Sequence, residues 1–169
     1  MRRWRGPSST SLVEGPRTAK RRFACPLSGP YITPMRTLDE IIADFEFLDD
    51  WEDRYRYLIE LGRDLPPYPD DKRDADHLVR GCASQVWVDT EIGEGAVMRV
   101  RADSDAHIVR GLVALALATY ADRPATEVAA TEMDPIMKRI GLDAHLTPQR
   151  ANGFASLVGR IRAEAAAAG

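Results

Sequence analysis

The chain has 169 residues, 29% charged and 44% hydrophobic, which suits one domain with its own core, and its two cysteines provide no disulfide framework. Residues 1–34 hold seven basic residues and one acidic residue (net +6), so the remaining 16 basic and 25 acidic residues give 35–169 a net charge of −9. An acidic domain repels nucleic-acid phosphates, and the longest apolar run, 111–118, is too short to cross a bilayer, which argues against both kinds of partner.

Residues 1–34 form a basic leader that differs in composition from the rest of the chain. The leader is rich in Arg, Ser, Thr, Pro and Gly, and it has neither apolar periodicity nor a secretory signal. Such a composition predicts disorder. It also resembles an organelle transit peptide, and the alternative is an upstream extension of a chain that starts at Met35.

The first part of the domain, from residue 35 onward, is predicted to be helical. Thr37 and Glu40 have the spacing of a capping box. The helix that they open has one apolar face, formed by Ile41, Ile42, Phe45 and Leu48. A second helix is expected over 51–61, with Gly62 just past its end. Three prolines then predict an irregular loop over 64–77.

Alternating apolar residues predict a small antiparallel sheet in the middle of the chain. Residues 86–88 and 98–102 are expected to pair as a hairpin, with Gly93 and Gly95 in its turn. Residues 78–79 are expected to add a short third strand. A sheet of this size needs helices on one face to bury its apolar side.

The C-terminal part is again predicted to be helical. Ser104 can cap a helix over 108–120, which is apolar on nearly all sides and therefore expected to be buried. Two shorter helices follow, the second of which is expected to have Asp134 as its cap residue, a proline at its first helical position and its end at Gly141. The last helix starts after Thr147 and carries an apolar stripe of Phe154, Leu157, Val158 and Ile161. The sequence thus predicts an α+β fold, with about three antiparallel strands packed against several helices.

Cys82 is the only cysteine in the part of the chain that is predicted to fold, and it lies between the irregular loop and the first strand. Arg80 places a cation near it, which favours the nucleophilic thiolate, and the small Gly81 lets another molecule approach the sulfur. The alternative is that Cys82 is a small buried hydrophobic residue. The flanking residues favour the reactive thiol.

Metal sites and other cysteine chemistry are the competing interpretations. His77, His107 and His145 are far apart and lack ligand spacing, and one cysteine does not hold a cluster, so the sequence predicts neither a metal nor a cofactor. A hydrolase would pair Cys82 with a base such as His107, oriented by Asn152 or an aspartate. A thiol peroxidase would need Cys25 as its resolving cysteine. No hydrolase signature surrounds Cys82, and both alternatives remain open.

Two charged residues near predicted helix starts have different expected roles. Arg150 near the start of the last helix opposes the helix dipole, which predicts that it serves a partner or an ion pair. Asp105 lies near the start of the central helix, where an acidic side chain ordinarily compensates the dipole.

Four ordered stretches of the chain resemble the SufE family, the partners of cysteine desulfurases in iron–sulfur cluster assembly. Residues 80–87 resemble the sulfur-acceptor loop of that family, with Ala83 where many members carry Gln. The other three stretches are 51–62, 103–112 and 145–153. The match runs from about Leu38 to Ala166, and the spacing of the stretches is compatible throughout.

The resemblance implies a SufE/IscU-like fold for a domain over 35–169 and a role as a sulfur carrier without a cofactor of its own. Cys82 would accept persulfide sulfur from a SufS-type cysteine desulfurase, a pyridoxal-phosphate enzyme, and thereby stimulate it. The sulfur would then pass to an iron–sulfur scaffold complex. The residues expected in the loop or facing a partner are Arg80, Gly81, Gln85, Trp87, Asp105 and Arg150. Whether the domain forms a homodimer is left open.

The resemblance also bears on the leader and on location in the cell. Because the match begins just after Met35, we favour an upstream extension over a transit peptide. The lack of a secretory signal and the scarcity of cysteine predict a reducing cytoplasm. An organelle is expected instead if residues 1–34 are a transit peptide.

Overall fold

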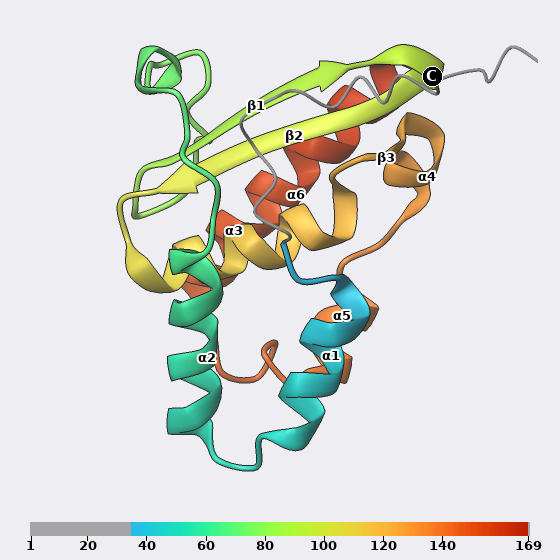
Figure 1. Cartoon of the computed structure of the whole chain (residues 1–169). Coiled ribbons are helices and arrows are strands. Elements are labelled where there is room, and N and C mark those ends of the chain that lie inside the picture. The colour runs from blue at the N-terminus through green and yellow to red at the C-terminus, as the bar shows by residue number, and fades with distance from the viewer. Residues whose placement is uncertain (1–34, 169) are drawn as a thin grey trace, which may run out of the picture. The chain divides into compact units, whose positions relative to one another are not determined.

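A computed structural model describes residues 35–168 of the chain. They contain a three-stranded antiparallel sheet in the order β1-β2-β3, packed with α-helices (Figure 1). β1 (Val86–Ile92) pairs with β2 (Val97–Ser104) along its whole length, and β3 (Arg123–Pro124) lies beside the start of β2. The predicted α+β fold is confirmed. The expected turn between β1 and β2 holds a 3-10 helix, η2 (Glu94–Ala96).

The third strand of the sheet is not the one that the sequence predicted. Leu78 forms only a single antiparallel bridge with Trp87, and the N–H of Val79 donates to the carbonyl of Val86 at 2.8 Å. The bridge goes no further because Gly81 has a φ of +94°, which turns the chain out of the strand direction. The third strand is β3, which follows the central helix and was not predicted.

Two helices cover the apolar face of the sheet, α3 (His107–Tyr120) and α6 (Pro148–Ala168) (Figure 1). α3 is buried along most of its length, and α6 turns its predicted apolar stripe inward, so both predictions are confirmed. The predicted cap of α3 is wrong. Ala106 is the capping residue, while the Ser104 hydroxyl donates to the carbonyl of Gln85 at 2.7 Å.

The helices α1 (Leu38–Phe47) and α2 (Trp51–Arg63) precede the sheet in the chain. The capping box of α1 is confirmed, since the Thr37 N–H donates to the Glu40 carboxylate at 2.8 Å and the Glu40 N–H donates to the Thr37 hydroxyl at 3.3 Å. Gly62 lies inside α2 rather than past its end. A Cβ on Gly62 would lie 2.7 Å from the backbone nitrogen of Gly111 in α3, so this glycine allows the two helices to cross closely.

Two short helices, α4 (Ala125–Ala130) and α5 (Asp134–Arg139), connect β3 to α6, as the sequence predicted. Asp134 is the first helical residue of α5 rather than its cap, which is Met133, and Gly141 follows the helix with a φ of +70°. Within residues 35–168, no helix is both long enough and apolar enough to span a bilayer.

Candidate functional site

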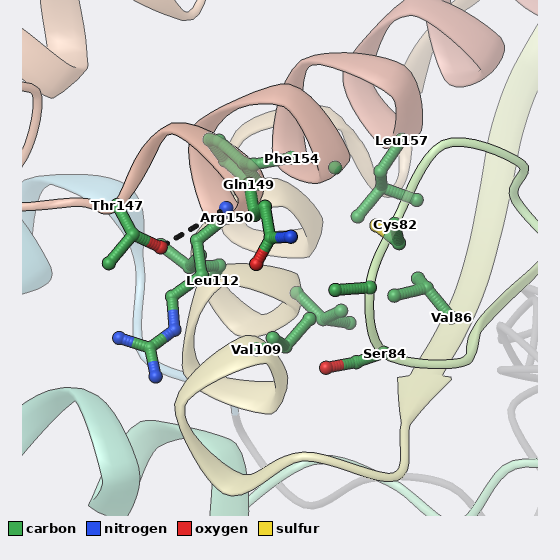
Figure 2. Close-up of a pocket in the computed structure, with 13 residues that line it drawn as sticks. Cys82, Ser84, Val86, Val109, Leu112, Thr147, Gln149, Arg150, Phe154 and Leu157 are labelled. Carbon is green, nitrogen blue, oxygen red and sulfur yellow. Dashed lines mark hydrogen bonds between the residues drawn. The ribbon is translucent and has the colours of Figure 1, made fainter.

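Cys82 lies at the tip of a short loop that leads into β1. The loop is closed by the hydrogen bond that the Val79 N–H donates to the carbonyl of Val86 at 2.8 Å, next to the bridge between Leu78 and Trp87, so that residues 80–85 lie beyond the paired end of the sheet. Its tip turns inward, and Cys82 is a free, partly buried thiol packed against the hydrophobic core. Figure 2 shows the sulfur beside α6, on the wall of a cavity.

This cavity has a volume of about 290 Å³ and lies between the Cys82 loop, α3 and α6. Its apolar lining comes from Val86 in β1, from Val109, Leu112 and Val113 in α3, and from Phe154 and Leu157 in α6. Its polar lining comes from Ser84, Thr147, Gln149 and Arg150. A cavity of this composition can shelter a reactive sulfur from water while leaving polar groups beside it.

The thiol of Cys82 is not activated in the way that the sequence predicted. Burial raises the pKa of the Cys82 thiol, and no charged group in the described part of the chain offsets this effect. Arg80 is exposed and lines a separate hollow with Ser156 and Arg160, so it does not stabilise the thiolate. The expectation that Arg80 lowers the pKa of Cys82 is therefore wrong.

Two glycines allow the Cys82 loop to pack against α6. Gly81 has a φ of +94°, a conformation that side chains other than glycine rarely adopt, and a Cβ there would lie 3.1 Å from the Ser156 hydroxyl. Gly153 faces Cys82 directly. An added Cβ on Gly153 would overlap Cys82 Sγ and lie 3.2 Å from both Cys82 Cα and Cβ. A glycine in the interior of a predicted helix was the only signal in the sequence for this role of Gly153.

Asp105 holds the far end of the loop instead of compensating the dipole of α3. Its carboxylate accepts the N–H of Gln85 at 3.0 Å, and its own N–H donates to the carbonyl of Gln85 at 3.2 Å. Asp105 precedes the helix cap, and no acidic residue lies in the first turn of α3. The prediction of dipole compensation is therefore wrong, and the exposed Gln85 is bound through its backbone.

Trp87 is not exposed to a partner, because a loop of this chain covers its side chain. Only 8% of Trp87 is exposed, and the guanidinium carbon of Arg73 lies 5.1 Å from its ring centroid. In an antiparallel strand alternate side chains point to opposite faces. Val86 and Val88 point into the core and Trp87 points to the outer face, where the irregular loop before Cys82 covers it.

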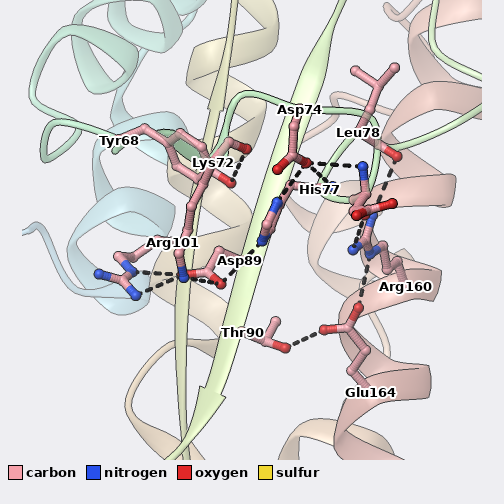
Figure 3. A network of polar contacts seen from close by, with 11 residues as sticks. Tyr68, Lys72, Asp74, His77, Leu78, Asp89, Thr90, Arg101, Arg160 and Glu164 are labelled. Carbon is pink, nitrogen blue, oxygen red and sulfur yellow. Dashed lines mark hydrogen bonds and ion pairs between the residues drawn. The ribbon is translucent and has the colours of Figure 1, made fainter. Parts of the chain in front are cut away.

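Buried carboxylates fix that irregular loop to the outer face of the sheet. Asp89 of β1 pairs with Lys72 and Arg101 at 2.7 Å each, and it lies 3.7 Å from a ring nitrogen of His77 (Figure 3). Asp103 of β2 pairs with Arg73 at 2.7 Å and with Arg110 at 3.1 Å. The loop over 64–77 contains one 3-10 helix, η1 (Asp70–Lys72), and is otherwise irregular as predicted.

Arg150 lies in the first turn of α6 and lines the same cavity as Cys82. Its backbone N–H is 3.5 Å from the Thr147 hydroxyl, and in Figure 2 its guanidinium extends to the side opposite Cys82. The structure thus brings Arg150 and Cys82 to one cavity. Its predicted role toward a partner stays a prediction.

The structure does not assemble the catalytic group of a cysteine hydrolase. None of the three histidines lines the cavity of Cys82. His107 is exposed at the start of α3, His77 lies 2.8 Å from Asp74, and His145 stacks on Trp51 with ring centroids 3.4 Å apart. Asn152 is exposed and does not line the cavity. Cys25, the resolving cysteine of the peroxidase alternative, lies outside the described residues.

No site for a metal ion is evident in the described part of the chain. Among residues 35–168, no three His, Cys, Asp or Glu side chains converge closely enough to hold one.

Comparison with known proteins assigns this arrangement to a family. Residues 39–165 match the family model of SufE, described as an Fe-S metabolism associated domain. The chain belongs to the SufE family. It is 55% identical over 134 residues to an uncharacterized SufE-like protein of Rhizobium etli, covering 78% of this chain and 90% of the relative. An uncharacterized SufE-like protein of Rhizobium meliloti is 49% identical, with 78% and 96% covered.

A solved structure supports the fold independently of the sequence relatives. The solution structure of a hypothetical protein from Thermus thermophilus superposes with a TM-score of 0.63 at 22% identity, covering 78% of this chain and 94% of that protein. At this identity the likeness shows a shared fold only. Membership of the SufE family associates the chain with iron–sulfur metabolism.

Proposed function

We propose that this protein accepts persulfide sulfur from a cysteine desulfurase on Cys82, stimulates that enzyme and relays the sulfur to iron–sulfur cluster assembly. The observation that carries the proposal is the position of Cys82 in a SufE-family chain, where it is a free thiol at the tip of a loop and borders a sheltered cavity. Residues 80–85 lie beyond the paired end of the sheet, so a partner can contact this loop without unpairing the strands.

The proposed step is a thiol exchange without net oxidation. The Cys82 thiolate attacks the terminal sulfur of the desulfurase persulfide, and a new S–S bond forms between Cys82 Sγ and that sulfur. The original S–S bond breaks, and the desulfurase cysteine leaves as a thiolate. Removing the persulfide returns the desulfurase to a form that can take another cysteine substrate, which explains how a carrier stimulates an enzyme.

The chemistry of the step indicates the partners and the compartment. A SufS-type pyridoxal-phosphate desulfurase supplies a persulfide, and an iron–sulfur scaffold complex consumes it. Cys82 must remain a free thiol to take part, so we expect the protein to act in a reducing compartment such as the cytoplasm. The acidic net charge of residues 35–169 suits a protein partner rather than a nucleic acid.

The proposal is tested by incubating the protein with a SufS-type desulfurase and cysteine and measuring its intact mass. Without added reductant we expect one added sulfur atom on Cys82, and in a parallel reaction, where an added dithiol reduces the persulfide, we expect faster sulfide release by the desulfurase. The Cys82→Ser variant should fold, gain no sulfur and give no stimulation, because a serine hydroxyl stays protonated at neutral pH. Full stimulation by folded Cys82→Ser would refute the proposal.

A second variant separates sulfur transfer from hydrolase-like catalysis. His107 is exposed and lines no part of the Cys82 cavity, so His107→Ala should transfer sulfur at the parent rate. Loss of transfer in folded His107→Ala would mean that a cysteine–histidine pair operates, and it would restore the alternative from hydrolase chemistry.

A further inference from the structure

Helix α6 passes Cys82 at a residue that has no side chain. A Cβ on Gly153 would overlap Cys82 Sγ and would lie 3.2 Å from both Cys82 Cα and Cβ, a separation that is tight for any carbon contact. Rotation of the cysteine side chain alone cannot relieve the contacts to Cα and Cβ. Any larger residue at this position therefore requires the loop itself to move away from α6.

The glycines of α6 differ in what lies beside them. One turn after Gly153, the Ser156 hydroxyl lies 3.1 Å from the position of a Cβ on Gly81. Gly159, two turns after Gly153, has nothing within 4 Å of its Cβ position. A glycine inside a helix costs about 1 kcal/mol relative to alanine. At Gly153 the absence of a side chain leaves room for Cys82, whereas at Gly159 no other group occupies the corresponding space.

We propose that Gly153 is a positioning residue for Cys82. Because Gly153 has no side chain, the thiol of Cys82 can lie directly against the backbone of α6, and this contact sets how far the thiol is withdrawn from solvent. This inference rests on the proposed function, in which Cys82 is the sulfur acceptor. Burial at this position also raises the pKa of the Cys82 thiol. Because the thiolate is the nucleophile, the position of Cys82 against Gly153 keeps the resting thiol slow to react.

The test compares Gly153→Ala with the matched control Gly159→Ala in the full chain, with Cys25 replaced by serine so that only Cys82 reports. The rate of alkylation by iodoacetamide is measured from about pH 6 to about pH 10. Gly153→Ala should lower the apparent pKa of Cys82 toward the ordinary value of about 8.5. The thiolate fraction at neutral pH should rise about tenfold for each unit of that decrease, and the alkylation rate should rise about threefold, because a thiolate of lower pKa is a weaker nucleophile. Gly159→Ala should match the parent. Equal pH profiles for all three chains would overturn the inference.

A double-mutant cycle tests whether the effect acts through the cysteine. The loss of unfolding free energy caused by Gly153→Ala should be smaller, or reversed, in a chain that also carries Cys82→Ala, because the main clash is gone. Gly159→Ala should change stability equally in both backgrounds. Unfolding of Gly153→Ala only when Cys82 is present would support the coupling. The same loss in both backgrounds would overturn it.

The two proposals fail in different ways. Sulfur transfer from the desulfurase to Cys82 is measured on the parent chain in the same series. If no persulfide forms but the cycle shows coupling, the proposed function is wrong and the position of Cys82 is still set by Gly153. If persulfide forms but Gly153→Ala behaves like Gly159→Ala, the proposed positioning role of Gly153 is wrong and the proposed sulfur transfer to Cys82 still holds.

Discussion

At the scale of single residues, the central observation is that Cys82 is partly buried without a compensating charge. A cation near a cysteine stabilises the thiolate, whereas burial favours the neutral thiol. Here Arg80 lines a separate hollow, so burial prevails and the pKa of the Cys82 thiol is raised. The resting protein therefore holds the Cys82 thiol in the less reactive form.

The raised pKa of Cys82 has a measurable effect on stability. Below about pH 8 the thiol is protonated in both the folded and the unfolded chain, so pH has no effect through this group. Above about pH 8.5 the unfolded chain loses this proton while the folded chain keeps it, so stability falls as pH rises. In thermal melts, the stability of the parent relative to Cys82→Ala should decrease as the pH rises from about 8 to about 9.5. A constant difference would contradict the raised pKa.

The backbone at Gly81 gives a second prediction at this scale. Gly81 and Gly95 both have positive φ, at +94° and +71°, but only Gly81 neighbours Cys82. Alanine at either position should cost about 1–2 kcal/mol of unfolding free energy, because a side chain strains this conformation. Gly81→Ala should also slow sulfur transfer from the desulfurase, whereas Gly95→Ala should not. Equal transfer rates for the two variants would show that the loop conformation does not matter for transfer.

At the scale of elements, the chain on both sides of Cys82 is anchored to the sheet. The preceding segment is fixed to the outer face through Asp89 and Asp103, which are 8% and 5% exposed, and the loop is closed by the contact between Asp105 and Gln85. Between these anchors, residues 80–84 make no backbone–backbone hydrogen bond with the described part of the chain. The position of the loop tip therefore depends on its packing against α6.

The anchor at Asp103 can be tested with a control that uses the same arginine. Arg73 pairs with the buried Asp103 at 2.7 Å and with the exposed Asp70 at 3.2 Å. Asp103→Asn should lower the free energy of unfolding by about 3 kcal/mol, because it leaves Arg73 and Arg110 without their buried counter-charge. Asp70→Asn should cost less than about 1 kcal/mol, since exposed pairs contribute little. Chemical denaturation of both variants checks this, and equal losses would argue against the anchor.

Most elements could be predicted from the sequence, because helices and strands leave local periodic patterns. The capping box at Thr37, the hairpin over 86–102 and the apolar stripe of α6 all follow from spacing alone. The strand β3 is too short to leave such a pattern, since only two residues pair with β2. Gly62 was misplaced because a helix end and a close helix crossing both favour glycine, and only the packing against α3 distinguishes them.

The residues of the candidate site could be predicted from the sequence, but their burial and contacts could not. Cys82 and Arg150 were identified from their neighbours and from the family resemblance, and the structure brings them to one cavity. Three features of the site depend on contacts between segments that are distant in sequence. They are the burial of Trp87, the contact between Gly153 and Cys82, and the hydrogen bond that the Gln85 N–H donates to Asp105. Such contacts decide exposure and pKa, and no local pattern encodes them.

At the scale of the whole molecule, the hydrophobic core is continuous from α1 to α6. Its buried members extend from Ile41 to Ala165, and every α-helix of the described residues contributes to it together with β1 and β2. This extent matches the family model over 39–165. We therefore expect the proposed function to need only the part of the chain that contains this core.

The contribution of residues 1–34 can be measured by deleting them. The deletion changes the net charge from −3 to −9 and removes no residue of the described core, so the thermal midpoint should move by less than about 3 °C. The shortened chain should also accept sulfur on Cys82 and stimulate the desulfurase at the parent rate, because every residue of the Cys82 cavity is retained. Differential scanning calorimetry and the sulfur-transfer assay check the two expectations. A drop of about 10 °C would mean that residues 1–34 contribute to the stability of the domain, and a loss of stimulation at unchanged stability would mean that they contact the desulfurase.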